Sequence, residues 1–183
     1  MFQMYLLKFI LILFVMTSET FGDIIFKDNF TSRENWKLIT DQVMGGISTG
    51  EVKFINRKNN SYVNLKGNVS TKNRGGFIQI RSDLRNVNLE EAKYIHIEAK
   101  GNNQNYFLHI RTKGTFLPWQ YYSMNFKVNE TFKFYKLAIE NFKRSSSFIS
   151  KKIKPKNITS IAIVAFGRDH LASIFVKEIQ FSN

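Results

Sequence analysis

Apolar and polar residues alternate with a period of two along most of the chain. In the segment YIHIEA (residues 94–99), Ile95, Ile97 and Ala99 fall on one face of an extended strand, and polar or aromatic residues fall on the other. The segment SIAIVAF (residues 160–166) is apolar throughout, which predicts a strand that is covered on both faces. Glycine, asparagine, serine and lysine interrupt the alternation at short intervals, as turns do.

This alternation predicts an all-β protein in which about ten short strands form a sandwich or a barrel. One helical turn fits residues 88–94, and no longer helix, internal repeat or interdomain linker is predicted. The expected strand segments are residues 23–30, 35–40, 50–56, 61–67, 75–82, 94–101, 105–114, 121–128, 132–142, 160–167 and 173–181.

Length and composition narrow the class of protein. With 183 residues the chain fits one domain, and a hydrophobic content of 43% is enough for a core. The formal net charge of +13 favours attraction to phosphate, anionic lipid or acidic protein surfaces without choosing among them. The sequence has no cysteine, so disulfides and thiolate metal sites are excluded.

The N-terminal segment predicts a secretory signal peptide over residues 1–22, followed by a β-sandwich domain over residues 23–183. Lys8 precedes the apolar run 9–16, and small or polar residues follow as far as Gly22. The apolar run is shorter than a membrane-spanning helix requires. We therefore expect an exported protein, periplasmic or secreted, with an uncleaved membrane anchor as the alternative and a mitochondrial location disfavoured.

The stretch DQVMGGISTG (residues 41–50) contains an acidic residue, an apolar pair that is expected to be buried, and two consecutive glycines. It lacks the strand-to-helix context of the dinucleotide-binding glycine motif and the lysine of the P-loop. We interpret it as a tight corner between two strands, in which the glycines supply positive φ and Asp41 accepts hydrogen bonds from turn amides. The pair Gly75 and Gly76 opens a later strand and needs the same backbone freedom.

Together with other residues, these glycine pairs resemble the family of complex I intermediate-associated protein 30. The family pattern has a Trp, an Asp-Asp-Val-Met-Gly-Gly-Val-Ser block, an Asn-Gly-Gly-Phe block and a Tyr-x-Leu-x-x-Arg strand. Arg74 is inserted in the second block, Gln42 replaces the second acidic residue, and residues 138–140 replace a Leu-Pro-Phe. The loss of the second acidic residue weakens any role for paired carboxylates. The matching residues are Trp36, Asp41, Val43, Met44, Gly45, Gly46, Ser48, Asn73, Gly75, Gly76, Phe77, Arg81, Tyr106, Leu108, Arg111 and Phe142.

The resemblance implies a single jelly-roll β-sandwich of the galactose-binding-like type. It also implies a chaperone-like role in protein–protein contact, in the manner of assembly factors of NADH:ubiquinone oxidoreductase, with respiratory-chain subunits as partners. The export signal is at odds with that role, because mitochondrial members of the family act in the matrix. The alternative is an exported module on the same fold that binds a carbohydrate or another small ligand.

No catalytic constellation stands out, so we expect no enzyme activity and no cofactor. Three histidines lie on separate segments, and none of the common hydrolase or metalloprotease motifs is present. His96 and His109 would approach each other if their strands were neighbours, with Glu98 and Arg111 nearby. A solvated polar sheet face is the simpler interpretation, because a fold alone does not give a function.

Aromatic and polar residues on outward strand faces suit carbohydrate binding, because rings stack on apolar sugar faces while Arg and Asn bridge hydroxyls. Ordinary cross-strand aromatic pairing explains the same residues without a ligand. The candidate carbohydrate-binding face comprises Tyr94, His96, Phe107, His109, Arg111, Trp119, Tyr121 and Asn125.

Modules of this fold often hold calcium near the first and last strands, where Asp23, Asp28 and Glu178 are the candidate ligands.

The segment KRSSSFISKKIKPK (residues 143–156) predicts a long exposed loop that has six basic and no acidic residues. We expect either an ordinary solvated loop or one that docks on an anionic membrane or an acidic partner, with Phe148 and Ile149 inserted into the interface. Nucleic acid is disfavoured as a partner, because the aromatic RNA-binding consensus is missing. The basic residues are Lys143, Arg144, Lys151, Lys152, Lys154 and Lys156.

Overall fold

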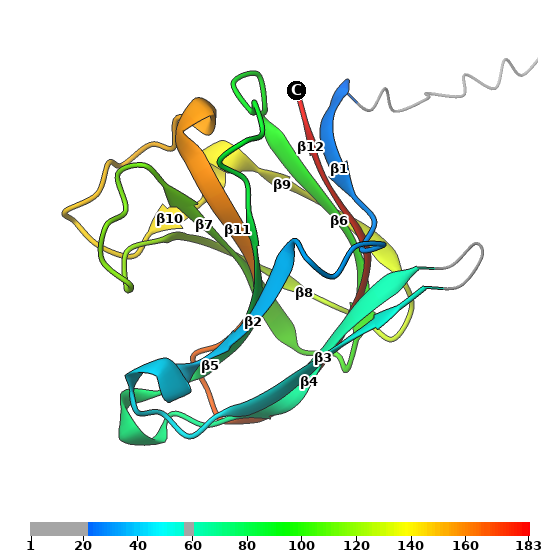
Figure 1. Cartoon of the computed structure of the whole chain (residues 1–183), viewed down its shortest axis with the longest axis vertical. Helices are drawn as coiled ribbons and strands as arrows, with labels where there is room; N and C mark the ends of the chain where they lie inside the picture. Colours follow the sequence, from blue (N-terminus) through cyan, green and yellow to red (C-terminus); the bar gives the residue numbers. More distant parts are fainter. Residues whose placement is uncertain (1–21, 57–60) are drawn as a thin grey trace, which may run out of the picture.

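Two antiparallel sheets pack face to face in the computed structural model, which describes residues 22–56 and 61–183 (Figure 1). Sheet A has the strand order β3 (Thr49–Ile55), β4 (Tyr62–Val69), β12 (His170–Ser182), β6 (Tyr94–Gly101) and β9 (Lys133–Ala138), and β1 (Ile24–Asp28) pairs with the end of β12. Sheet B has the order β10 (Lys143–Arg144), β8 (Tyr122–Lys127), β7 (Asn105–Thr112), β11 (Ile158–Phe166), β5 (Phe77–Asp83) and β2 (Trp36–Thr40).

The prediction of an all-β sandwich is confirmed, with β1 to β12 in place of the roughly ten strands expected. The short β10 falls inside the segment that was predicted to be a loop. Within the segment 88–94, where one helical turn was expected, a single turn is closed by the Ala92 amide, which donates to the Leu89 carbonyl at 3.0 Å. No helix in the described ranges is long and apolar enough to cross a bilayer. The predicted signal peptide covers residues 1–22, of which residues 1–21 lie outside the described residues.

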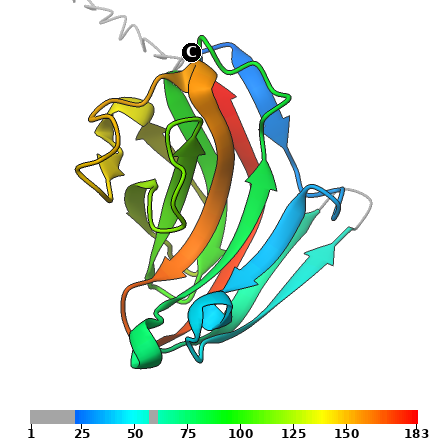
Figure 2. The ribbon, with the colours of Figure 1, turned by 60° about the vertical axis from the view of Figure 1, so that its left-hand side comes forward.

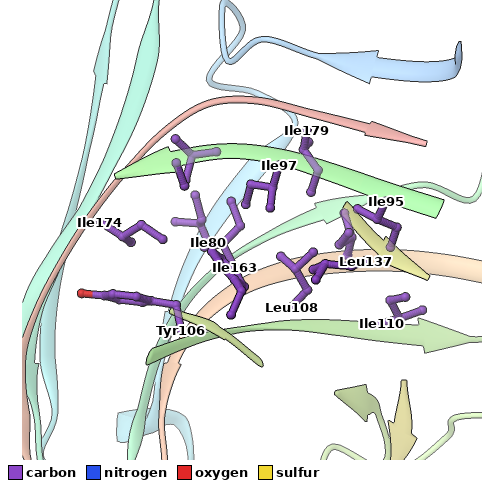
Figure 3. Close-up of a cluster of buried hydrophobic side chains, with 14 of the residues drawn as sticks. Ile80, Ile95, Ile97, Tyr106, Leu108, Ile110, Leu137, Ile163, Ile174 and Ile179 are labelled. Carbon is purple, nitrogen blue, oxygen red and sulfur yellow. The ribbon is translucent and has the colours of Figure 1, made fainter. Parts of the chain in front are cut away.

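The core lies between the two sheets, where the apolar side chains of both inner faces pack against each other (Figure 3). Sheet A contributes Ile95 and Ile97 of β6, and sheet B contributes Leu108 of β7 and Ile163 of β11, all fully buried. Burying one side chain of this size stabilises the fold by about 1.5–3 kcal/mol. The period-two alternation therefore identifies the inner faces of these strands correctly.

β11 is covered on both faces, as its unbroken apolar sequence predicts. Ile161 and Ile163 belong to the core, while Ala162 and Val164, on the other face of sheet B, are 2% and 1% exposed. We name this other face, whose side chains point away from the core, the open face of sheet B. Because the middle strand carries small side chains there, the larger side chains of β5 and β7 rise on either side of it.

A buried carboxylate joins the corner after β2 to the start of β5. The corner is the 3-10 turn η1 (Asp41–Met44), and Asp41 has no exposed surface. Its carboxylate accepts hydrogen bonds from the Ser48 amide at 2.9 Å, the Ser48 hydroxyl, the Gly76 amide at 2.6 Å and the Phe77 amide at 3.3 Å. Burial alone would raise the pKa of this carboxyl, but the hydrogen bonds outweigh burial and lower the pKa below its ordinary value.

The motif glycines allow this arrangement in two different ways. Gly45 and Gly76 have φ of +87° and +129°, a region that residues with a Cβ rarely adopt. A Cβ on Gly46 would lie 2.3 Å from the Asp41 Cγ, and a Cβ on Gly75 would lie 2.4 Å from the Asp41 Oδ2. The Asp41 carboxylate occupies amides that a bound phosphate would need, so the stretch is a structural corner and not a phosphate site.

The apolar pair of the motif is exposed, so the expectation that it is buried is wrong. Val43 is 74% exposed and Met44 is 52% exposed, since η1 directs these side chains toward solvent. Trp36 is buried, and its indole Nε1 donates to Asp28 Oδ2 at 2.9 Å. Asn73 adopts a positive φ of 56° in the turn before the second glycine pair.

We expect the Gly46→Ala variant to lose about 3 kcal/mol of unfolding free energy, because the new Cβ would displace the buried carboxylate from its donors. Gly45→Ala is the matched control. Its Cβ would meet no atom within 4 Å, so only the positive φ costs stability, about 1 kcal/mol. Urea unfolding followed by tryptophan fluorescence measures both changes. A Gly46→Ala protein as stable as the wild type would contradict the role assigned to this corner.

Candidate binding site

The open face of sheet B carries polar and aromatic side chains on both sides of β11. Figure 2 looks toward this sheet, with β2, β5 and β11 side by side and the loops that follow β7 and β10 at the left-hand edge. The register shows which side chains face each other across the middle strand. Asp83 and Arg111 flank Ser160, Arg81 and His109 flank Ala162, and Gln79 and Phe107 flank Val164.

An aromatic cluster occupies the β7 side of the open face. The Tyr121 ring stacks on the His109 ring, with centroids 4.0 Å apart and planes 12° apart. Phe166 meets His109 and Phe107 edge to face at centroid distances of 5.5 and 5.7 Å. Tyr121 is half-buried, so part of its surface packs on His109 and part stays accessible to a ligand.

His109 serves this cluster as an aromatic platform and not as a titrating group. Its side chain is buried, and burial together with the positive charge of Arg81 lowers its pKa to about 3. The ring is therefore neutral at physiological pH. In that state it supports Tyr121 by stacking, an arrangement that aromatic rings favour.

A groove of about 520 Å³ lies beside the aromatic cluster, where β2, β5 and β11 run next to each other. We name it the arginine groove. Hydroxyl and amide side chains contribute to its walls, and Asp83 within it is paired with Arg85, whose amide donates to Asp83 at 2.9 Å. The hydroxyl and amide groups can donate hydrogen bonds to a ligand that is rich in oxygen acceptors. The charged side chains that line the groove are Glu34, Lys37, Arg81, Asp83, Arg85 and Arg111.

Two arginines of the groove differ in what they bind. Arg111 Nη2 donates to the Thr115 carbonyl at 2.9 Å and to the Leu117 carbonyl at 3.1 Å, so Arg111 holds the loop between β7 and β8. The Arg81 guanidinium makes no hydrogen bond or ion pair with any other residue that the structure describes. Burial, and then the nearby charge of Arg111, lower the pKa of Arg81, and burial lowers the pKa of Arg111. Arg81 is thus the better candidate for contacting a ligand.

Sequence reasoning selected Arg111 and missed Arg81 as a binding residue. The signal was present in the strand FIQIRS, where Arg81 alternates with Ile78 and Ile80 and so belongs to the outward face. Lys37 was missed as well. It lies directly opposite Arg81 on β2 and brings a further positive charge to the groove.

The structure divides the predicted binding face between the two sheets. Tyr94 and His96 lie on β6 in sheet A, so the expectation that His96 and His109 occupy neighbouring strands is wrong. The chain crosses from one sheet to the other after Gly101 instead of forming a hairpin. Trp119 lies in the loop between β7 and β8 and is 57% exposed. The predicted residues that gather on the open face of sheet B are Phe107, His109, Arg111, Tyr121 and Asn125.

Of the three carboxylates considered as calcium ligands, two bind other protein groups and the third is exposed to solvent. Asp28 accepts a hydrogen bond from the Phe30 amide at 2.7 Å, and Glu178 pairs with Lys27 at 2.6 Å. Asp23 is exposed. In the parts of the chain that the structure describes, no group of three or more acidic or histidine side chains is placed to hold a metal ion. The structure therefore gives the calcium hypothesis no support.

The basic segment 143–156 is anchored more firmly than a free loop. Its first two residues form β10, which pairs with β8, and Arg144 Nη1 donates to the carbonyls of Ser147 and Ile149. Ile149 is 5% exposed, so the prediction that it inserts into an interface is wrong. Phe148 is 91% exposed, and the six basic side chains all face solvent.

Residues 24–173 match the protein family described as Complex I intermediate-associated protein 30 (CIA30). The chain belongs to this family. The family match covers both the corner around Asp41 and the strands that form the arginine groove. The family resemblance predicted from the sequence is therefore confirmed. A search of curated protein sequences gave no match.

Solved structures with the same fold include several carbohydrate-binding modules. A family 11 module of a cellulosomal cellulase from Clostridium thermocellum has a TM-score of 0.70 at 12% identity, over 88% of this chain and 95% of that one. The family 11 module from Clostridium thermocellum in complex with a β-1,3-1,4-mixed-linked tetrasaccharide has a TM-score of 0.69 at 13% identity, over 89% and 96%. A family 30 module has a TM-score of 0.52 at 12% identity, over 75% and 92%. At these identities the likeness shows the β-sandwich fold alone.

We expect the His109 ring to stay neutral down to about pH 4, because its pKa in the folded protein is about 3. The unfolded chain has the ordinary histidine pKa of about 6.5, so this group favours unfolding progressively as the pH falls between the two values. An NMR titration of the imidazole resonances measures the folded-state pKa. A His109 midpoint near the ordinary value would contradict the buried, stacked geometry.

Docking of the basic segment on an anionic membrane stays a prediction. We expect the double variant Lys151→Gln, Lys152→Gln to bind phosphatidylserine vesicles roughly 30-fold more weakly than the wild type, at about 1 kcal/mol per lysine. The control is Lys66→Gln, Lys133→Gln, which removes two exposed lysines of sheet A. Co-sedimentation at low and high salt measures binding. Equal binding by the two double variants would show that the segment is an ordinary solvated loop.

Proposed function

We propose that this chain is a non-catalytic binding module that takes a carbohydrate on the open face of sheet B. One observation carries the proposal: the accessible Tyr121 ring and the arginine groove lie next to each other on one face. The Tyr121 ring and the groove are neighbours for a simple reason. Tyr121 stacks on His109, and His109 faces Arg81 of the groove across Ala162. A sugar uses both features, since a ring packs on its apolar face and polar groups bind its hydroxyls.

The solved structures of the same fold support the proposal without deciding it. One of them is a module in complex with a β-1,3-1,4-mixed-linked tetrasaccharide, and the family 30 structure is also a carbohydrate-binding module. Fold likeness does not assign a function, so the proposal depends on the side chains of this chain. The groove volume of about 520 Å³ is typical of sites for small ligands.

The chemistry of the open face supports binding without catalysis. His109 is a weak base, since burial and the charge of Arg81 lower its pKa to about 3. Asp83 is paired with Arg85, and its hydrogen bonds from Arg85 lower its pKa. A glycoside hydrolase needs a carboxyl of raised pKa as its general acid, which is the opposite of the situation at Asp83.

A protein partner is the second candidate, and membership of the complex I intermediate-associated protein 30 family favours it. The family-defining corner exposes Val43, Met44 and Ile47, at 74%, 52% and 47%. These apolar side chains stand on a turn that Asp41 holds rigidly by hydrogen bonds. Apolar side chains exposed together on a rigid element suit contact with another protein, here a subunit of the respiratory chain in a chaperone-like role.

The N-terminal sequence bears on the choice between these candidates. Residues 1–22 have the layout of a secretory signal, and an exported protein meets carbohydrate polymers outside the cell. A matrix assembly factor would carry an Arg-rich transit peptide instead. The expected export therefore supports the carbohydrate candidate, and N-terminal sequencing of the mature protein from cell fractions tests it.

We expect the wild-type protein to bind at least one oligosaccharide on a glycan array, and the Tyr121→Ala variant to bind it about tenfold more weakly. Phe134→Ala is the matched control, because Phe134 is an exposed ring on β9 of sheet A, away from the open face of sheet B. Titration calorimetry measures affinity, and thermal unfolding in parallel separates a loss of binding from a loss of structure.

Two outcomes would contradict the carbohydrate candidate. If no glycan binds, while respiratory-chain subunits co-purify with the wild type and not with a Met44→Ser variant, the protein-partner candidate is correct. If Tyr121→Ala loses stability in proportion to binding, Tyr121 is a structural residue and the open face loses its aromatic platform.

A further inference from the structure

Two guanidinium groups face the arginine groove from opposite sides of β11. Arg81 projects from β5 next to Ala162, and Arg111 projects from β7 next to Ser160, one position further along the open face. Only small side chains separate them. Both arginines are partly buried, and the charge of Arg111 contributes to lowering the pKa of Arg81. Two like charges thus lie close together in a partly desolvated groove, which costs free energy in the absence of a ligand.

The carboxylates of the groove leave this pair uncompensated. Asp83 forms its ion pair and its hydrogen bonds with Arg85. Lys37 stands directly opposite Arg81 and adds positive charge. Of the charged groups that line the groove, four are cationic and only Glu34 and Asp83 are acidic. The local field of the groove is therefore positive and favours an anionic group on a ligand.

Arg81 has its hydrogen-bonding capacity free for a ligand. No described residue accepts a hydrogen bond from its guanidinium, which carries five N–H donors in a planar fork. That fork matches the two oxygens of a carboxylate or of a sulfate. Arg111, by contrast, donates hydrogen bonds from Nη2 to the loop between β7 and β8, and these bonds fix its position beside the groove.

We propose that the arginine groove selects an anionic glycan, whose carboxylate or sulfate group binds Arg81 and Arg111 while a neighbouring sugar ring packs on Tyr121. This inference rests on the proposed carbohydrate function and adds to it the class of sugar. It makes Arg81 a specificity residue. A neutral glucan of the same shape would leave the two guanidinium groups uncompensated, and so it binds more weakly.

The stability of the empty protein gives an independent sign of this role. The Arg81 side chain makes no hydrogen bond to any residue within 22–56 or 61–183, and its removal relieves repulsion with Arg111. We therefore expect the melting temperature of Arg81→Gln to equal or exceed that of the wild type. Loss of ligand binding in this variant then reflects a lost contact and not a damaged fold.

The test uses pairs of oligosaccharides that differ in charge alone. A galacturonate tetrasaccharide is compared with its methyl ester, and a sulfated heparan tetrasaccharide with its desulfated form, by titration calorimetry at low and high salt. We expect the wild type to bind one charged member at least tenfold more tightly than its uncharged counterpart, with a preference that weakens at high salt. Arg81→Gln abolishes the preference, and the control Lys66→Gln on sheet A keeps it.

Each result has one meaning. The pair that shows the preference tells whether a carboxylate or a sulfate is bound. Equal binding of charged and uncharged members by the wild type overturns the anionic inference and leaves the carbohydrate function standing. A preference that persists in Arg81→Gln overturns the assignment to this groove. If none of the four oligosaccharides binds and a glycan array is also negative, both the inference and the proposed function fail.

Discussion

Much of this fold depends on one buried carboxylate. Asp41 accepts hydrogen bonds from Ser48, just before β3, and from Gly76, just before β5. Gly76 lies 35 residues after Asp41 in the chain. Hydrogen bonds to a charged group contribute about 1.5–3 kcal/mol each. They hold the start of β5, the strand that places Arg81 opposite Ala162 of β11. The family motif thus serves the candidate site indirectly, by setting the position of a strand that forms it.

The open face of sheet B is more buried than an outward sheet face usually is. Side chains that point away from a core are normally solvated, yet His109 and Gln79 are nearly as buried here as core residues. The small side chains of Ala162 and Ser160 on β11 allow larger groups to close in from both sides. Desolvation of polar and charged groups is unfavourable on its own, and it is found where a ligand completes the interactions. That reasoning, more than the fold, makes this face the candidate site.

The sequence predicted what depends on local rules and missed what depends on distant contacts. Alternation identified the inner faces, because burial has a period of two in any strand, whichever sheet it joins. The same rule cannot tell which sheet a strand enters, so it grouped His96 with His109 although β6 and β7 lie in different sheets. The hydrogen bonds of Asp41 followed from glycine chemistry. Two features did not follow from it: the burial of Ile149, and the lack of a side-chain partner for Arg81 among the described residues. Both depend on segments far away in the chain.

Chemical-shift mapping of the backbone amides tests whether ligands bind the open face of sheet B. An isotope-labelled protein is titrated with whichever oligosaccharide binds most tightly on an array. We expect the largest shifts to cluster in residues 79–83, 107–111 and 158–164, on three strands that form the open face of sheet B. Shifts confined to sheet A, or to the exposed corner at residues 43–47, would contradict it.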